Sequence, residues 1–365
     1  MIDNFNLLED LARKGTVKTH SVDILRYVPM PLPLDFDFSK IEGMLLGVAV
    51  GDSLGATSEG MLPGDRRRKY GEISDYVPGS RSGWKTVGVP TDDTQLTFWT
   101  LRQLIEDGGL IPDNLAKRFC RHHINGIGTT TKGFISNYRD RHKPWYDAGL
   151  ESLGNGALMR ISPIVVPYLK QPNESMYADA ALDAMITHNS FGNTATCVAF
   201  VNILWLLLSM KSAPEPRWWV DSYCALAGRL EGNAASNDVS YHHSYKEPLC
   251  QFTERVVTDA LRRRLSVVDA CNTWGSGASL FETVPSVLYI LATQAQNGEQ
   301  AIIRAVNDTK DNDSIAAIVG AAVGALYGSS CIPNRWIKGL TGRTRSDDDG
   351  EVFKIILAAK QKFWS

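Results

Sequence analysis

The sequence lacks the features that would assign it to a disulfide-rich, zinc-binding, secreted or membrane class. No two of its six cysteines, Cys120, Cys197, Cys224, Cys250, Cys271 and Cys331, form a CxxC pair. Such scatter argues against a zinc or redox motif and is typical of free thiols in a reducing compartment. No basic segment followed by an apolar run opens the chain, and the most apolar stretch, 198–210, is shorter than the ~20 residues that span a bilayer. We therefore expect a cytoplasmic protein.

An excess of charge of either sign is also missing. The chain has 38 Lys and Arg against 40 Asp and Glu. Binding to nucleic-acid phosphates needs a basic excess, so no nucleic-acid partner is expected. Hydrophobic residues make up 44% and charged residues 21% of the 365 residues, which is typical of a globular protein with its own core.

Residues 1–40 differ from the rest of the chain. Leu7, Leu8 and Leu11 have the spacing of one short amphipathic helix. The segment 29–34, Pro-Met-Pro-Leu-Pro-Leu, then forbids helix and favours an extended backbone. We expect an arm that lies outside the core. Two interpretations stay open: a terminus that is disordered or strapped down, or a segment that docks into a partner.

Glycine recurs every four residues in two apolar segments. The first ladder consists of Gly43, Gly47, Gly51 and Gly55, and the second of Gly320, Gly324 and Gly328. Because each glycine weakens a helix by up to ~1 kcal/mol, the close approach of another backbone must offset the cost. We predict that the two small-faced helices lie against one another, or against a common third helix.

Apolar periodicity predicts further helices, and alternating strands are few. The predicted helices are 94–107, 113–124, 155–169, 176–187, 192–211, 217–230, 251–264, 279–295, 298–306 and 350–362. Residues 230–250 are predicted to form a long loop. The simplest architecture is one compact all-α domain over 41–365, preceded by the extended arm at 1–40.

Two clusters of carboxylates stand at predicted helix starts. Thr91-Asp92-Asp93-Thr94 follows Pro90, and Asp311-Asn312-Asp313-Ser314 opens the helix of the second ladder. Capping of a helix N-terminus explains one residue of each cluster. Neighbouring carboxylates repel, however, unless a cation offsets their charge, and their oxygens are ligands that Mg²⁺, Mn²⁺ and Ca²⁺ prefer. We predict that the two clusters meet and share a pair of ions.

Three further elements are less specific. Asp52 and Glu59 follow the first ladder, where Asp52 could cap or pair and Glu59 could lie on the surface. The segment 154–160, Gly-Asn-Gly-Ala-Leu-Met-Arg, is either a plain turn or a turn whose free N–H groups favour phosphate. His188 follows Thr187, and a lone histidine is more often structural than catalytic.

In this order, these elements resemble the ADP-ribosylglycohydrolase family from Ile41 to about Gly339. The shared motifs are G-x-x-x-G-D-x-x-G-x-x-x-E ending at Glu59, T-D-D-T at 91–94, G-N-G-x-x-M-R at 154–160, T-H at 187–188 and D-x-D-S at 311–314. Their combination is far more specific than any one of them. One departure is Lys310, which stands where the family often has glycine. The family fold is a compact all-α domain, in agreement with the helical pattern.

The resemblance implies two Mg²⁺ or Mn²⁺ ions and a set of site residues. The metal ligands would be Thr91, Asp92, Asp93, Asp311, Asp313 and Ser314. ADP-ribose would be bound by Gly154, Asn155, Gly156, His188 and a further loop that includes Gly277. Glu59 and Asp92 are the candidates for activating water. No ligand position carries an inert residue, so we expect an active enzyme.

The expected function is hydrolysis of ADP-ribose from a mono-ADP-ribosylated protein, with arginine favoured over serine on family grounds. Positive charge would develop at C1″ as in other glycoside hydrolysis. A compatible alternative is an immunity or antitoxin protein whose arm at 1–40 blocks an ADP-ribosyltransferase. A third interpretation is a scaffold relative without turnover. No membrane partner is expected.

Overall fold

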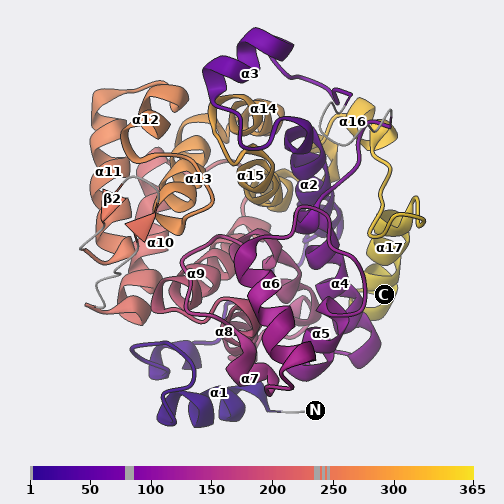
Figure 1. Ribbon diagram of the computed structural model, residues 1–365, viewed down its shortest axis with the longest axis vertical. Coiled ribbons are helices and arrows are strands. Elements are labelled where there is room, and N and C mark those ends of the chain that lie inside the picture. Colours follow the sequence, from indigo (N-terminus) through magenta and orange to yellow (C-terminus); the bar gives the residue numbers. More distant parts are fainter. Residues whose placement is uncertain (1–2, 79–85, 234–238, 241–242, 245–246) are drawn as a thin grey trace.

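The computed structural model describes residues 3–78, 86–233, 239–240, 243–244 and 247–365, which are mostly helical (Figure 1). The predicted all-α class is confirmed. The α-helices are α1 (Asn4–Arg13), α2 (Ser39–Gly55), α3 (Pro63–Tyr70), α4 (Asp92–Asp107), α5 (Pro112–Phe119), α6 (Thr129–Ile135), α7 (Trp145–Ala148), α8 (Ser175–Thr187), α9 (Phe191–Leu208), α10 (Pro216–Glu231), α11 (Leu249–Arg263), α12 (Val267–Trp274), α13 (Leu280–Gln294), α14 (Gly298–Asp308), α15 (Asn312–Tyr327), α16 (Asn334–Gly339) and α17 (Glu351–Phe363). Shorter elements are η1 (Asp23–Arg26), η2 (Ala56–Ser58), η3 (Ser136–Asp140), η4 (Leu158–Arg160), η5 (Ser162–Tyr168), η6 (Ser329–Cys331), β1 (Val239–Ser240) and β2 (His243–Ser244).

Helices α2 and α15 lie side by side near the middle of the molecule (Figure 1). A Cβ atom on Gly47 would lie 2.1 Å from the carbonyl oxygen of Gly320, and one on Gly324 would lie 2.0 Å from that of Gly43. No side chain can occupy such a space, so only glycine permits the two backbones to approach this closely. The predicted contact between the two glycine ladders is therefore confirmed.

The most apolar helix, α9, packs among α8, α10 and α15. Of the helices in the described ranges, it alone is long and apolar enough, by length and composition, to cross a membrane. Within the fold, however, 83% of its span is buried. A helix that is apolar on all sides and buried by its neighbours is typical of a protein core.

Two sequence predictions of local structure differ from the fold. Residues 155–169 form η4 and η5 in place of the predicted α-helix, because Pro163 and Pro167 lack the backbone N–H that α-helical hydrogen bonds require. The predicted loop at 230–250 lies partly outside the described residues, and its described part includes antiparallel β1 and β2. Apolar periodicity also misses the short helices α3, α6 and α12.

The segment before α2 lies against the helical domain, with α1 packed beside α8 (Figure 1). Phe5, Leu8 and Leu11 on α1 are buried, so the expectation that this segment lies outside the core is wrong for these side chains. The family-like domain therefore shares its core with α1. Four large apolar side chains of the segment are exposed to solvent: Tyr27, Val28, Met30 and Leu34.

A buried carboxylate on α8 anchors α1. Asp179 accepts a hydrogen bond from the amide of Asn4 at 2.5 Å and one from the hydroxyl of Tyr168 at 2.6 Å. Burial raises the pKa of Asp179 to about 7, although both hydrogen bonds oppose the shift. The folded state therefore holds this proton more tightly than the unfolded chain, in which an aspartate titrates near ~3.9.

We predict that Asp179 makes folding stability dependent on pH. Its contribution is fully present below about pH 4 and is lost as the pH rises through about 7, because the raised pKa favours the protonated folded state. Asp179→Asn cannot ionise and should flatten the fall in thermal midpoint between pH 5 and pH 8. The control is Asp23→Asn, at an exposed carboxylate. Parallel midpoint curves for the Asp179 variant and the wild-type protein would contradict the prediction.

Candidate active site

The carboxylate of Asp52 joins the end of α2 to the start of α4. Its oxygens accept backbone N–H bonds from Thr91 at 2.9 and 3.0 Å and from Thr94 at 3.0 Å. The two threonine hydroxyls donate to it as well, at 2.8 and 2.5 Å. Helix N-termini leave such N–H groups without intrahelical partners. Asp52 therefore fixes the turn that carries Asp92 and Asp93.

Helix α15 begins beside the same turn. The amide of Asn312 donates to the carbonyl oxygen of Gly55 at 3.2 Å, and a Cβ atom on Gly55 would lie 2.4 Å from the Cα of Asp313. The start of α15 is thus packed directly on the end of α2. Ser314 Oγ lies 3.4 Å from Asp93 Oδ2, so the two acidic helix starts meet as the sequence predicts.

Two groups of three carboxylates result from this packing. In each group, one oxygen per residue lies within 4.8 Å of the others; the groups are Asp52, Asp93 and Asp313, and Glu59, Asp311 and Asp313. Asp313 belongs to both groups. It therefore stands where the two acidic sets join.

Burial and mutual repulsion raise the pKa of these carboxyl groups. Burial raises the pKa of Asp52 to about 6; burial and then the charge of Asp52 raise the pKa of Asp92 to about 8. The pKa values of Asp93 and Asp313 lie well above the ordinary range, through burial first and neighbouring aspartates second. Near neutral pH, Asp92, Asp93 and Asp313 therefore favour the protonated form unless a cation offsets their charge.

The donor set fits a divalent cation. Asp93 Oδ1 and Asp313 Oδ1 are buried and accept no hydrogen bond from the described residues. A buried oxygen left without a partner is costly, and carboxylate oxygens are preferred ligands of Mg²⁺ and Mn²⁺. Asp52 differs, because the donors of Thr91 and Thr94 already satisfy both of its oxygens. We infer that Asp52 positions the ligand turn, although its oxygens lie close enough to coordinate.

The carboxylates line a cavity of about 170 Å³, called here the acidic cavity. Its lining residues are Glu59, Asp92, Asp93, Gly126, Gly128, Thr129, Thr130, Thr131, Gly154, Asn155, Gly156, Met159, His188, Ala278, Asp311, Asp313 and Ser314. Every site residue predicted from the sequence is among them except Thr91 and Gly277. None of these lining residues is a lysine or an arginine.

The ring of His188 packs against the turn at 154–156. A Cβ atom on Gly156 would lie 2.8 Å from His188 Cε1, so the close approach of the ring explains this glycine. Burial, and secondarily the charge of Arg160, lowers the pKa of His188 to about 3. The imidazole is therefore neutral, and its Nδ1 is hydrogen-bonded to the Thr187 hydroxyl at 2.8 Å.

Asn155 links this turn to the start of α15. Its amide donates to Asp311 Oδ2 at 2.6 Å and to Thr283 Oγ1 at 3.0 Å. Arg160, at the end of the same motif, is buried in an ion pair with Asp183 and does not line the cavity. The motif therefore combines one residue that orients a carboxylate with one that stabilises the core.

Three residues named by the sequence motifs lie beside the acidic cavity. Gly277 is next to Ala278, which lines it, and the N–H of Gly277 donates to Glu282. Thr91 donates hydrogen bonds from its N–H and its hydroxyl to the Asp52 carboxylate. Lys310 replaces a family glycine without backbone strain, because its φ is not positive, and its N–H donates to Ser276 Oγ at 3.0 Å.

Sequence reasoning missed Asp52 as part of the site. The aspartate was weighed only as a cap or a pairing partner. A signal was present, because Asp52 lies between Gly51 and Gly55 on the first ladder, and Asp313 stands in the first turn of the helix that carries the second ladder. Packing the two ladders in register brings these acidic residues to the same end of the pair.

The sequence model of the ADP-ribosylglycohydrolase family matches residues 34–362. Together with the acidic site and the helical fold, this match places the chain in the ADP-ribosylglycohydrolase family. Hydrolytic removal of ADP-ribose is the reaction that defines this family, and the chain is accordingly a hydrolase.

Individual relatives agree with this assignment. An ADP-ribosylhydrolase ARH3 from Xenopus tropicalis is 25% identical and aligns with 86% of this chain and 94% of its own length. An ADP-ribosylarginine hydrolase Tri1 from Serratia proteamaculans is 25% identical over 98% of this chain and 90% of its own length. A solved structure described as an ADP-ribosylglycohydrolase-related protein complex is 24% identical, with a TM-score of 0.65, over 90% of this chain and 99% of that chain. This last likeness shows a shared fold.

Proposed function

We propose that this chain is a divalent-metal-dependent hydrolase that removes ADP-ribose from arginine side chains of modified proteins. The observation that carries the proposal is the meeting of the two acidic helix starts, where Asp93 and Asp313 each have a buried oxygen without a hydrogen-bond partner in the described parts of the chain. Similarity to an ADP-ribosylarginine hydrolase over 98% of the chain favours arginine as the modified residue.

Two Mg²⁺ or Mn²⁺ ions would be held by the oxygens of both helix starts. The proposed ligands are Thr91, Asp92, Asp93, Asp311, Asp313 and Ser314. When bound, such ions offset the carboxylate charge and lower the pKa of nearby water. This explains why so many carboxylates can share a buried site.

The chain's own residues orient the substrate and move protons. The N-glycosidic bond between C1″ and the guanidine nitrogen breaks, with positive charge developing at C1″. Glu59, which directly follows η2, lies among the carboxylates and is proposed to accept a proton from the attacking water, with Asp92 as the second candidate. The turn at 154–156 and His188 would contact ADP-ribose, and Asn155 holds Asp311 in place.

Release of ADP-ribose tests the proposal. The protein is incubated with arginine-modified and serine-modified peptides, with Mg²⁺, with Mn²⁺ and with chelator. We expect release from the arginine-modified peptide, loss of release with chelator, and its return when a metal is added in excess. Release that is unaffected by chelator would refute the metal requirement, and release from the serine-modified peptide alone would refute the arginine assignment.

We also propose a cytoplasmic location, supported by the absence of a disulfide among the six free cysteines. Binding of an ADP-ribosyltransferase by the arm at 1–40 stays a prediction. The exposed side chains of Tyr27, Met30 and Leu34 favour contact with some partner. Removal of the whole segment would be a poor test, because it would also remove the core side chains of α1.

A further inference from the structure

A second cavity adjoins the acidic cavity at Glu59. Its volume is about 330 Å³, and Glu59 and Gly126 line both cavities. Thr91, whose N–H and hydroxyl both donate to Asp52, lines the second cavity and not the acidic cavity. Of the carboxylates that line the acidic cavity, Glu59 is the one that also faces the second cavity.

The lining of the second cavity suits a cationic side chain. Among the described residues that line it, Glu59 is the one carboxylate, and lysine and arginine are absent. Its other polar side chains carry hydroxyls, an imidazole and an amide: Ser53, Thr57, Thr86, Thr91, His123 and Asn125. A guanidinium group would meet one opposite charge and several hydrogen-bond acceptors here.

The turn at 154–156 and His188 line the acidic cavity, and none of them lines the second cavity. In the proposed function, ADP-ribose contacts the turn at 154–156 and His188. Its C1″ atom then lies at the carboxylates, and the group attached to C1″ points away from that turn.

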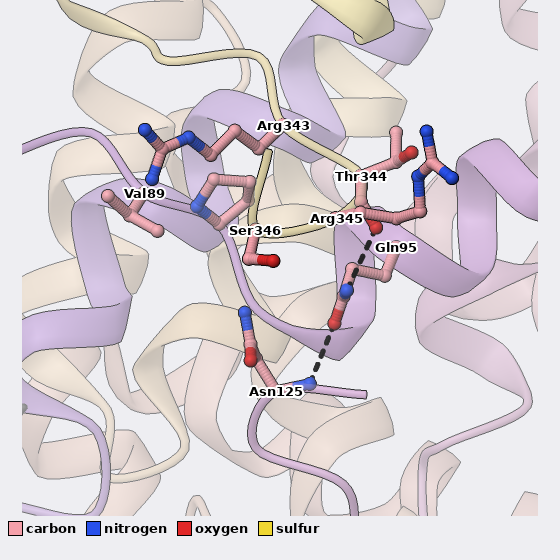
Figure 2. A pocket seen from close by; sticks show the side chains of 8 residues that line it. Val89, Gln95, Asn125, Arg343, Thr344, Arg345 and Ser346 are labelled. Atoms are coloured by element: carbon pink, nitrogen blue, oxygen red, sulfur yellow. Dashed lines mark hydrogen bonds between the residues drawn. The ribbon is translucent and has the colours of Figure 1, made fainter. Parts of the chain in front are cut away.

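The second cavity adjoins a third, whose lining residues are shown in Figure 2. The two share Val89, Pro90 and Asn125, and the far end is formed by residues 343–346 of the chain between α16 and α17. In Figure 2, Gln95 of α4 stands between Thr344 and Asn125: its amide donates to the Thr344 carbonyl oxygen at 2.9 Å, and its Oε1 accepts the Asn125 N–H at 2.7 Å. The segments that contain Thr344 and Asn125 are thus held together through Gln95 without a ligand.

Hydrogen bonds between Thr341 and Gly88 join the segment 86–90 to the segment that follows α16. The N–H and the hydroxyl of Thr341 both donate to the carbonyl oxygen of Gly88 at 2.9 Å. Gly88 has φ +65°, and a Cβ atom there would lie 2.1 Å from the carbonyl oxygen of Gly339. Glycine is therefore required at this position, and the chain segment 86–90 is held against the segment that follows α16.

We propose that the second and third cavities form one substrate groove. The modified arginine binds at Glu59, and the polypeptide to which this arginine belongs extends along the groove towards residues 343–346. The inference rests on the proposed function and adds a binding site for the protein part of the substrate. Hydrolysis transfers OH from water to C1″ and H to the guanidine nitrogen. Arginine is then released into the groove, and ADP-ribose remains on the side of His188.

Substitutions at two points along the groove test the proposal. Asn125→Arg places a cation beside the guanidinium, and should lower kcat/KM at least about tenfold for both free ADP-ribosyl-arginine and a modified ten-residue peptide, because like charges in an interface repel strongly. Ser346→Trp fills the far end, and should lower kcat/KM for the peptide while leaving the free amino-acid conjugate unchanged. Binding of free ADP-ribose, measured by calorimetry, should be unchanged in both variants.

The matched control is Gln251→Arg, which adds the same charge on the exposed face of α11 and should alter none of these quantities. If Asn125→Arg weakens ADP-ribose binding as much as it slows hydrolysis, the cavity holds ADP-ribose and the groove assignment is overturned. Full peptide activity in both variants would overturn it as well. A wild-type protein that releases no ADP-ribose from any conjugate would refute the proposed function itself, an outcome distinct from a failure of the groove alone.

Discussion

Asp313→Asn should abolish hydrolysis and remove most of the affinity for divalent cations. Asp313 is the one residue common to both carboxylate groups, and its Oδ1 is buried without a hydrogen-bond partner among the described residues. Loss of a residue that merely orients a metal ligand typically costs about 10–100-fold. In the proposed site Asp313 would be a metal ligand itself, so its removal should lower kcat/KM by more than about 100-fold. Mg²⁺ titration calorimetry and release of ADP-ribose measure the two effects.

Asp308→Asn is a suitable control for this variant. Asp308 is a partly buried carboxylate on α14 whose partner is Arg304, and it belongs to neither carboxylate group. This variant should keep its cation affinity and its activity. If Asp313→Asn bound Mg²⁺ as tightly as the wild-type protein, the assignment of the site would have to be abandoned. A circular dichroism spectrum for each variant separates loss of the site from loss of the fold.

Gly47→Ala should strongly destabilise the protein, because it adds a methyl group between α2 and α15. The new Cβ atom would lie 2.1 Å from the carbonyl oxygen of Gly320 and 2.4 Å from its carbonyl carbon. These are backbone atoms and cannot rotate away, so α2 and α15 would have to separate. Overpacking of side chains costs about 1–3 kcal/mol, and a backbone clash should exceed about 3 kcal/mol. Chemical denaturation measures the loss.

Gly64→Ala provides the opposite expectation. Gly64 lies in α3, and a Cβ atom there would meet only the end of the Arg68 side chain at 3.7 Å. Alanine in an unhindered helix is more stable than glycine by roughly 0.5–1 kcal/mol. The two variants should therefore shift the free energy of unfolding in opposite directions. Equal destabilisation by both would show that glycine at position 47 is not needed for close packing.

The central helix pair and the acidic site follow from local patterns in the sequence. A glycine every four residues is costly unless two backbones meet, and this reasoning predicts the α2–α15 contact without knowledge of the fold. Carboxylates crowded at two helix starts likewise predict that a cation draws them together. In both cases the sequence shows a local cost. For the glycines the structure shows the close backbone contact that offsets it; for the carboxylates it shows that the two clusters meet, and the cation stays a prediction.

Other parts of the site depend on tertiary packing that no local pattern reveals. Asp52 caps α4 from a different helix, so the donors that satisfy it lie 39 and 42 residues away. The groove is formed by chain segments around positions 57, 89, 125 and 345, which share no motif. The burial of α1 also escaped prediction, because proline at 29, 31 and 33 indicates an extended segment and says nothing about the helix that precedes it.

The glycine contacts also set the axial alignment of α2 and α15, and hence the spacing between the carboxylates they carry. A shift of one residue along a helix moves its side chains by about 1.5 Å. Coordination distances tolerate deviations of only about 0.2 Å. Backbone-to-backbone contact at Gly43, Gly47, Gly51 and Gly55 leaves no slack for such sliding. A substitution at a ladder glycine several turns away can therefore change the spacing between the carboxylates and lower activity, although no residue of the site itself is altered.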